Sequence, residues 1–163
     1  MKKLRISVIG TGHLGKIHTK LWKSNENVSL VGVYDLDSII AKQVAEEYSC
    51  KQFKSLDEVI ANSDAVTIAT PTTNHYRTAR KMIEQGIHCF IEKPITSTHN
   101  EAQQLLRLAR EHNVLIQVGH VERFNPALIA LKNETIDPIF IEVHRLSQFK
   151  PRATDVSVIS DLM

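Results

Sequence analysis

The amino-acid sequence predicts an α/β protein with a doubly wound parallel sheet. Short apolar runs alternate along the chain with stretches whose apolar residues recur at helical spacing. The first apolar run leads directly into a glycine-rich turn, and an acidic residue, Asp35, ends the second run. Alternation of this kind is typical of parallel strands joined by helices that cover both faces of one sheet.

Six apolar segments are expected to form the strands of this sheet. They cover residues 4–9, 28–34, 51–53, 65–69, 87–91 and 114–118. Each segment is short enough for a strand and is followed by a turn or a helical pattern. The spacing therefore predicts a sheet in which every connection is a helix or a short loop.

Local signals mark where the intervening helices begin and end. Asp37 or Ser38 can cap the helix that runs to about residue 48. Residues 55–58 and 98–101 each fit a capping box, in which a hydroxyl and a carboxylate satisfy the first backbone N–H groups. Gly86 is placed to end the helix that starts near residue 75.

The alternating pattern stops near Gly119, where we expect a second domain to begin. Residues 1–119 would form the parallel-sheet domain, and residues 120–163 the start of the second domain. A helical pattern covers residues 124–131, and apolar and polar residues then alternate over 139–144. This alternation predicts a half-buried strand of an antiparallel sheet.

Composition limits the kinds of partner that this chain can have. The chain has 163 residues and a formal net charge of +2, which is too small to favour nucleic acid. No apolar run approaches the ~20 residues that a membrane helix needs. Cys50 and Cys89 lack the spacing of metal ligands, so we expect no metal site and a reducing, cytoplasmic environment.

The glycine-rich turn reads G-x-G-x-x-G between the first predicted strand and the first predicted helix. In such a turn Gly10 permits the tight bend, Gly12 lets the backbone approach a pyrophosphate, and Gly15 allows close helix packing. Free N–H groups at the helix start then meet the phosphates, so the turn predicts a dinucleotide site on a Rossmann fold. The residues expected to bind the cofactor here are Gly10, Thr11, Gly12, His13, Leu14 and Gly15. Similar glycine turns also occur for packing alone, which is the alternative interpretation.

Asp35 lies 20 residues after Gly15, where a dinucleotide site has the carboxylate that binds the adenosine ribose. A carboxylate at this position accepts hydrogen bonds from the ribose hydroxyls and repels a 2′-phosphate, which favours NAD over NADP. Alternatively, Asp35 is only a turn residue or a helix cap. Asp37 can equally serve as that cap, which would leave Asp35 for the cofactor.

Two further segments carry a resemblance to a known family. Residues 69–75 read A-T-P-T-T-N-H, and Glu92-Lys93-Pro94 ends the fifth predicted strand. Together with the glycine turn they resemble the Gfo/Idh/MocA oxidoreductase family, over nearly the whole chain. The resemblance implies an N-terminal Rossmann domain, a mainly antiparallel α/β substrate domain, and oxidation or reduction of sugars and related polyols through NAD or NADP.

The resemblance also implies roles for particular residues. Lys93 would be catalytic, contacting the substrate and the nicotinamide ribose, and Glu92 would lie beside the cofactor. The residues lining the cofactor would be Thr70, Pro71, Asn74 and His75. Plainer alternatives remain: Lys93 can be an exposed loop lysine before a proline, His13 a solvated helix residue, and His75 a residue of a first helical turn.

The last part of the chain resembles the UDP-N-acetylglucosamine 3-dehydrogenase subgroup of this family. The similar segments are residues 118–126, 144–146, 149–152 and 155–163. Asp161 matches an Asp that the family follows, four residues later, with a catalytic His; that position lies beyond Met163. From this resemblance we expect Asp161 to be a catalytic residue, and this chain to bind cofactor with an incomplete active site.

Four basic residues are candidates for contact with substrate. His120 and Arg123 can meet substrate or phosphate, since arginine suits bidentate phosphate recognition, or can form salt bridges at a domain junction. Arg145 and Arg152 can bind the diphosphate of a nucleotide sugar or can lie on a polar sheet face. We expect a sugar or UDP-sugar substrate and a homo-oligomer for the full-length protein.

Two functions from different classes fit these observations. The first is an NAD-dependent dehydrogenase that acts on a sugar or nucleotide sugar. The second is a non-catalytic dinucleotide-sensing protein built on the same fold.

Overall fold

A computed structural model describes residues 3–135, 137–142 and 144. Its centre is a parallel sheet of six strands in the order β3-β2-β1-β4-β5-β6. The strands are β1 (Leu4–Ile9), β2 (Val28–Tyr34), β3 (Lys51–Gln52), β4 (Ala65–Ile68), β5 (His88–Ile91) and β6 (Ile116–Val118). The predicted fold class, a doubly wound parallel sheet, is confirmed.

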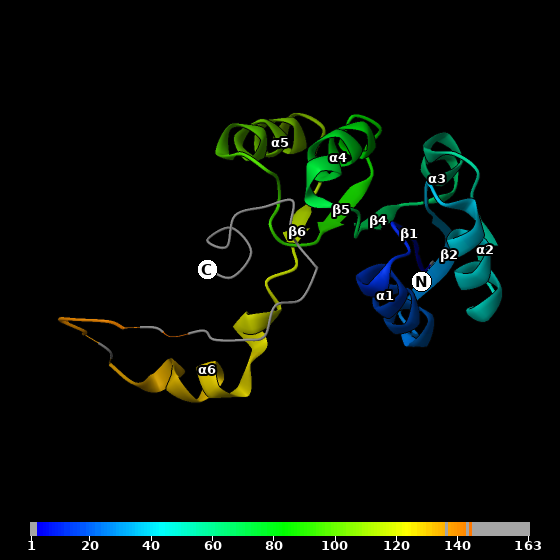
Figure 1. Cartoon of the computed structure of the whole chain (residues 1–163). Helices are drawn as coiled ribbons and strands as arrows, with labels where there is room; N and C mark the ends of the chain where they lie inside the picture. The colour runs from blue at the N-terminus through cyan, green and yellow to red at the C-terminus, as the bar shows by residue number, and fades with distance from the viewer. Residues whose placement is uncertain (1–2, 136, 143, 145–163) are drawn as a thin grey trace.

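Helices cover both faces of this sheet (Figure 1). They are α1 (His13–Ser24), α2 (Ser38–Glu47), α3 (Leu56–Asn62), α4 (His75–Ile83) and α5 (His99–Glu111), with a 3-10 turn, η1 (Thr72–Asn74), before α4. The strand order reverses between β1 and β4, because β2 and β3 extend one way from β1 and β4 to β6 extend the other. Ligands of doubly wound proteins bind at this reversal, outside the carboxyl ends of the strands.

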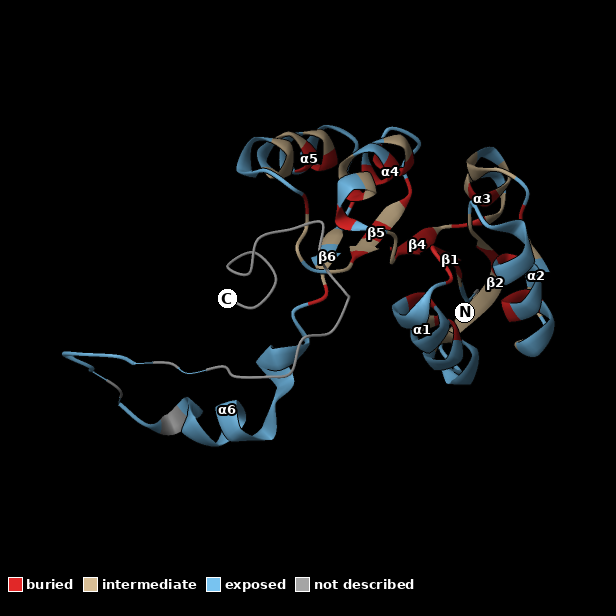
Figure 2. Cartoon of the chain, viewed as in Figure 1, coloured by how far each residue is buried: buried red, intermediate tan, exposed pale blue. Residues whose placement is uncertain are grey.

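The sheet separates two apolar clusters. Met82, Ile83 and Leu105 belong to the larger cluster, so α4 and α5 pack on one face. Val44 and Ala45 of α2 belong to the smaller cluster, with Trp22 of α1 packed against it on the other face. Of the two central strands, β4 is buried throughout and β1 is buried from Ile6 to Ile9 between these layers (Figure 2).

The helix caps follow from local sequence. The Asp37 side chain accepts hydrogen bonds from the N–H groups of Ile39 and Ile40 at 2.9 and 3.2 Å, so Asp37 is the cap of α2. The capping box predicted at residues 98–101 is complete. The box predicted at residues 55–58 is only half formed, because the Glu58 carboxylate accepts from the backbone N–H of Lys54 instead.

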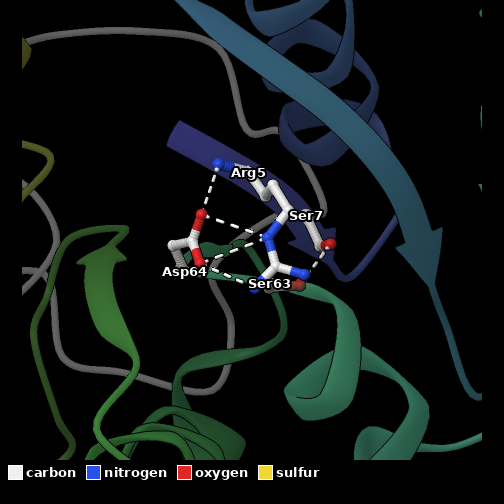
Figure 3. Close-up of polar contacts among 4 residues, drawn as sticks. All are labelled: Arg5, Ser7, Ser63 and Asp64. Atoms are coloured by element: carbon white, nitrogen blue, oxygen red, sulfur yellow. Dashed lines mark hydrogen bonds and ion pairs between the residues drawn. The ribbon is translucent and has the colours of Figure 1, made fainter. Parts of the chain in front are cut away.

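A polar cluster joins the two central strands near their amino-terminal ends (Figure 3). The guanidinium of Arg5 donates to Asp64 Oδ1 at 2.7 Å, and the backbone N–H of Arg5 donates to Asp64 Oδ2 at 2.9 Å. The buried hydroxyls of Ser7 and Ser63 are 2.6 Å apart. These contacts join β1 to the start of β4 on the amino-terminal side of the sheet, away from the carboxyl ends of the strands.

Beyond Gly119 the described chain forms only short helical turns. They are η2 (Val121–Phe124), α6 (Pro126–Ala130) and η3 (Leu131–Asn133), and Figure 2 shows this part as exposed. The strand predicted over 139–144 is wrong for the described residues 139–142 and 144, where no strand is found and Ile139 is fully exposed. A strand needs a neighbouring strand to satisfy its backbone groups, and the described residues supply none here. Among the described helices, none is both long and apolar enough to cross a membrane.

Candidate functional site

The glycine turn is packed tightly against the end of β4. Gly10 has a φ of +89°, and a Cβ atom there would lie 2.7 Å from the carbonyl carbon of Ala69. A Cβ atom on Gly15 would lie 1.7 Å from the carbonyl oxygen of Gly10. These two glycines are therefore required by the close approach of β1, α1 and β4.

Gly12 has no such requirement from the protein. Its φ is −63°, and a Cβ atom there would meet nothing within 4 Å. Gly12 is also the N-cap of α1, and within the described chain no side chain caps this helix. The first N–H groups of α1 are thus placed for an anion, and the open side of Gly12 leaves room for one to approach the backbone.

Asp35 follows β2 and is fixed beside the glycine turn. Its Oδ2 accepts from the backbone N–H of Thr11 at 2.6 Å and from the Thr11 hydroxyl at 3.0 Å. Its Oδ1 accepts from the backbone N–H of Asp37 at 3.0 Å. Each carboxylate oxygen can accept more than one hydrogen bond, so this anchoring still leaves capacity for a ligand hydroxyl.

The loop after β4 carries the next group of predicted site residues. His75 is 1% exposed, and its Nδ1 lies 2.9 Å from the carbonyl oxygen of Pro94 while its Nε2 lies 2.8 Å from that of Thr70. The Thr70 hydroxyl is buried and has no hydrogen-bond partner among the described residues. Pro71 is exposed and Asn74 is half-buried in the same loop.

Glu92 follows β5 and is held from two directions. Its Oε1 accepts from Nε2 of His18, on α1, at 2.6 Å, and its Oε2 accepts from the backbone N–H of Lys93 at 3.2 Å. Burial is the largest single influence on the pKa of Glu92 and acts to raise it. The hydrogen bond and charge of His18, the Lys93 N–H and the charge of His75 together outweigh burial and hold this pKa below its ordinary value. The carboxylate thus stays ionised beside Lys93, whose side chain is exposed.

These segments meet at one edge of the sheet because all six strands are parallel. The glycine turn follows β1, Asp35 follows β2, Thr70 follows β4 and Glu92 follows β5. His120 and Arg123 come directly after β6, where both are exposed. Of the other predicted residues, Arg145, Arg152 and Asp161 lie outside the described part of the chain.

Two contacts of this site were missed by sequence reasoning. His18 lies three residues after Gly15, so helical spacing alone could have placed it on the sheet-facing side of α1. Its partner, Glu92, is 74 residues away, and no local pattern reveals that pairing. The bonds from Thr11 to Asp35 likewise had no signal in the sequence. Among the described residues, no group of three or more His, Cys, Asp or Glu side chains could hold a metal ion.

The fold, and the residues gathered at the carboxyl ends of the strands, are those of a dinucleotide-binding Rossmann protein. A family model described as "Oxidoreductase family, NAD-binding Rossmann fold" matches residues 4–120. The chain therefore belongs to the Gfo/Idh/MocA oxidoreductase family, and the predicted family is confirmed.

Curated relatives include dehydrogenases of sugars and polyols. A UDP-N-acetylglucosamine 3-dehydrogenase of Acidithiobacillus ferrooxidans is 40% identical over 164 residues, which is 100% of this chain and 52% of the relative. An inositol 2-dehydrogenase of Rhizobium meliloti is 30% identical over 146 residues, covering 88% of this chain and 44% of the relative. The chain thus spans about half the length of these two curated relatives.

Solved structures of related proteins have a similar fold. A structure of the Acidithiobacillus ferrooxidans enzyme, GnnA, matches with a TM-score of 0.90 and 40% identity over 100% of this chain and 54% of that one. GenD2 from gentamicin A biosynthesis, solved in complex with NAD, matches with a TM-score of 0.76 and 26% identity over 80% of this chain and 38% of that one.

Proposed function

We propose that this chain supplies the cofactor-binding part of an NAD-dependent dehydrogenase. The reaction is hydride transfer between nicotinamide and a hydroxyl-bearing carbon of a sugar or nucleotide sugar. The observation that carries the proposal is the open backbone at Gly12 beside an anchored carboxylate, Asp35. The 40% identity to a UDP-N-acetylglucosamine 3-dehydrogenase favours a UDP-sugar over a free sugar.

The residues at the edge fit a nicotinamide dinucleotide. The N–H groups that open α1 suit its diphosphate, and Gly12 lets that diphosphate approach the backbone. Asp35 suits the adenosine ribose and opposes a 2′-phosphate, so NAD is preferred to NADP. Thr70, Pro71 and Asn74 would line the rest of the cofactor, and the buried hydroxyl of Thr70 has no hydrogen-bond partner among the described residues.

Unlike the residues that would line the cofactor, His75 has an indirect role in this proposal. Its ring is buried and both ring nitrogens are bonded to backbone carbonyls, so it shapes the cofactor site without touching the cofactor. Glu92 contributes in the same way, by holding the segment that carries Lys93.

The bound dinucleotide supplies the hydride acceptor of the reaction. The ammonium of Lys93 donates a hydrogen bond to the substrate oxygen and stabilises the negative charge that develops there. We assign Asp161 to the orientation of the group that removes the hydroxyl proton, following the family resemblance.

We further propose that residues 1–119 bind the cofactor and that residues 120–163 begin the substrate domain. His120 and Arg123 then lie where the two meet, and Arg145 and Arg152 would contact the substrate diphosphate. The free thiols of Cys50 and Cys89 suit a reducing compartment such as the cytoplasm. A homo-oligomer is proposed for the full-length protein.

Calorimetry and an NADH assay test this function. The chain is titrated with NAD⁺ and NADP⁺, and NADH formation is followed in the full-length protein with a panel of UDP-sugars. We expect NAD⁺ to bind, and Lys93→Ala to slow any NADH formation by about 100-fold or more, while Lys132→Ala at an exposed site changes nothing. Binding of NAD⁺ without NADH from any sugar would favour a non-catalytic dinucleotide-binding protein. Failure of both dinucleotides to bind would refute the proposal.

A further inference from the structure

We propose that His18 and His75 are positioning residues that fix Lys93 by holding its two sequence neighbours. His18 holds Glu92, and His75 holds Pro94. The inference rests on the proposed function for its catalytic meaning, because Lys93 is the residue placed next to the substrate there. The contacts themselves join described residues and do not depend on a bound cofactor or substrate.

The contact between His18 and Glu92 is a largely buried hydrogen bond to a carboxylate. The side chains of His18 and Glu92 are only 15% and 14% exposed, and their atoms Nε2 and Oε1 are 2.6 Å apart. The His18 ring also packs on Phe90, with ring centroids 5.3 Å apart. Behind the carboxylate, a Cβ atom on Gly119 would stand 3.1 Å from Oε2, so no larger residue fits there without a shift. The Glu92 carboxylate therefore has one well-defined position.

The fixed position of the Glu92 carboxylate also restrains the backbone of Lys93. Glu92 Oε2 accepts from the backbone N–H of Lys93, so the carboxylate that His18 holds in turn holds the lysine backbone. A hydrogen bond with an ionised partner is about twice as strong as a neutral one. Movement of the Lys93 backbone would break this bond or displace the His18 pair.

The contact on the Pro94 side comes from a different element. The ring of His75, the first residue of α4, contacts the carbonyl oxygens of both Pro94 and Thr70 at 2.9 and 2.8 Å. Each ring nitrogen lies within hydrogen-bond distance of one of these carbonyl oxygens, so the ring contacts both loops at once. The ring joins the loop after β4 to the loop after β5.

Both histidines also connect Lys93 to the cofactor-binding elements. His18 lies on α1, the helix whose first N–H groups face the proposed diphosphate, and His75 contacts the backbone carbonyl of Thr70, a residue proposed to line the cofactor. A displacement of about 1 Å at a catalytic group can slow a reaction by about 100-fold. The two contacts set the distance between Lys93 and the bound cofactor.

The test measures Lys93 itself. The chain is labelled with ¹⁵N, the Lys93 amide is assigned with a Lys93→Arg variant, and amide exchange is compared in His18→Leu, His18→Gln, His75→Leu and His75→Gln. His112→Leu, at an exposed site that ends α5, is the matched control. We expect exchange of the Lys93 amide to accelerate roughly tenfold or more in both leucine variants, the factor expected from loss of one charge-assisted hydrogen bond. Each glutamine, which can still donate one hydrogen bond, should restore part of that protection.

Exchange is read at several urea concentrations to separate local from global opening. If the leucine variants only lower global stability, so that Lys93 and core amides such as that of Ile68 accelerate equally, the proposal is overturned. It is also overturned if the Lys93 amide shift and exchange are unchanged. The measurement is made with and without NAD⁺. If the parent chain does not bind NAD⁺, the proposed function is refuted. The exchange data without NAD⁺ test the role of the two histidines independently of that result.

Discussion

The carbonyl oxygen of Gly10 lies where a side chain on Gly15 would have to begin, 1.7 Å from an ideal Cβ position. This approach brings the start of α1 against the end of β1 and leaves no room for any other residue at position 15. Gly12, between them, faces open space. The same turn thus contains one glycine required by packing and another that packing does not explain.

This difference predicts opposite results for two alanine substitutions. Gly15→Ala should lower the free energy of unfolding by about 1–3 kcal/mol or more, because the backbone must shift to avoid the clash. Gly12→Ala should leave urea unfolding nearly unchanged but weaken NAD⁺ binding, because the methyl group enters the space proposed for the diphosphate. Calorimetric titration and urea unfolding of both variants make the comparison. Equal NAD⁺ affinity in Gly12→Ala and the parent chain would contradict this assignment.

Replacing the carboxylate of Asp35 should alter cofactor preference. Asp35→Asn keeps the size of the side chain and an acceptor for the Thr11 N–H, but it removes the negative charge. We expect NAD⁺ binding to weaken by about tenfold or more, since hydrogen bonds to charged groups contribute about 1.5–3 kcal/mol. NADP⁺ should bind better than it does to the parent chain, because its 2′-phosphate is no longer repelled. Calorimetry with both cofactors checks this, and an unchanged ratio of affinities would exclude a role for Asp35 in selection.

The hydroxyl of Thr11 should influence the same preference indirectly. Thr11 is 2% exposed and donates to Asp35 from both its backbone and its side chain. Thr11→Val removes the hydroxyl bond but keeps the shape, so NAD⁺ should bind roughly 3- to 10-fold more weakly, in line with a net contribution of about 1 kcal/mol. Thr11→Ser, the matched control, should stay close to the parent chain. A serine variant as weak as the valine variant would show that the methyl group, not the hydroxyl, matters.

Glu92 should make stability depend on acid pH. Burial alone would raise its pKa, but the His18 contact, the Lys93 N–H and the charge of His75 lower it below the ordinary value of 4.5. A carboxylate with a lowered folded pKa stabilises the fold above its unfolded pKa, and this contribution disappears as the pH falls through the folded value. Glu92→Gln should therefore cost about 1–2 kcal/mol at pH 7 and progressively less below about pH 4.5. Urea unfolding across this range gives both curves, and a constant difference between them would contradict the assignment.

The two cysteines should differ in reactivity. Cys89 is 3% exposed and burial raises its pKa to about 12, so it is neither accessible nor ionised near neutral pH. The thiol of Cys50 is half-buried, and burial raises its pKa against the opposing charge of Lys23. Ellman's reagent should label at most Cys50, slowly, in the folded chain and both thiols in urea. Rapid labelling of a Cys50→Ser variant under native conditions would show that the Cys89 environment opens readily.

The sequence alone determined those features that neighbouring residues control. The order of strands and helices, a cap at Asp37 or its neighbour Ser38, and the capping box at residues 98–101 depend on groups within about four positions of one another. The position of Gly10 to Gly15 between a strand and a helix was likewise readable, because the motif and its flanking apolar patterns are local. These features made the fold class and the family predictable.

Only the tertiary structure decided which distant side chains meet. The contact of His18 with Glu92, the anchoring of Asp35 by Thr11 and the burial of the His75 ring join residues from different elements, so no periodicity could reveal them. The apolar alternation after residue 138 failed as a strand signal for the complementary reason. A strand is stabilised by hydrogen bonds to a neighbouring strand, and a pattern within one segment cannot say whether that neighbour is there.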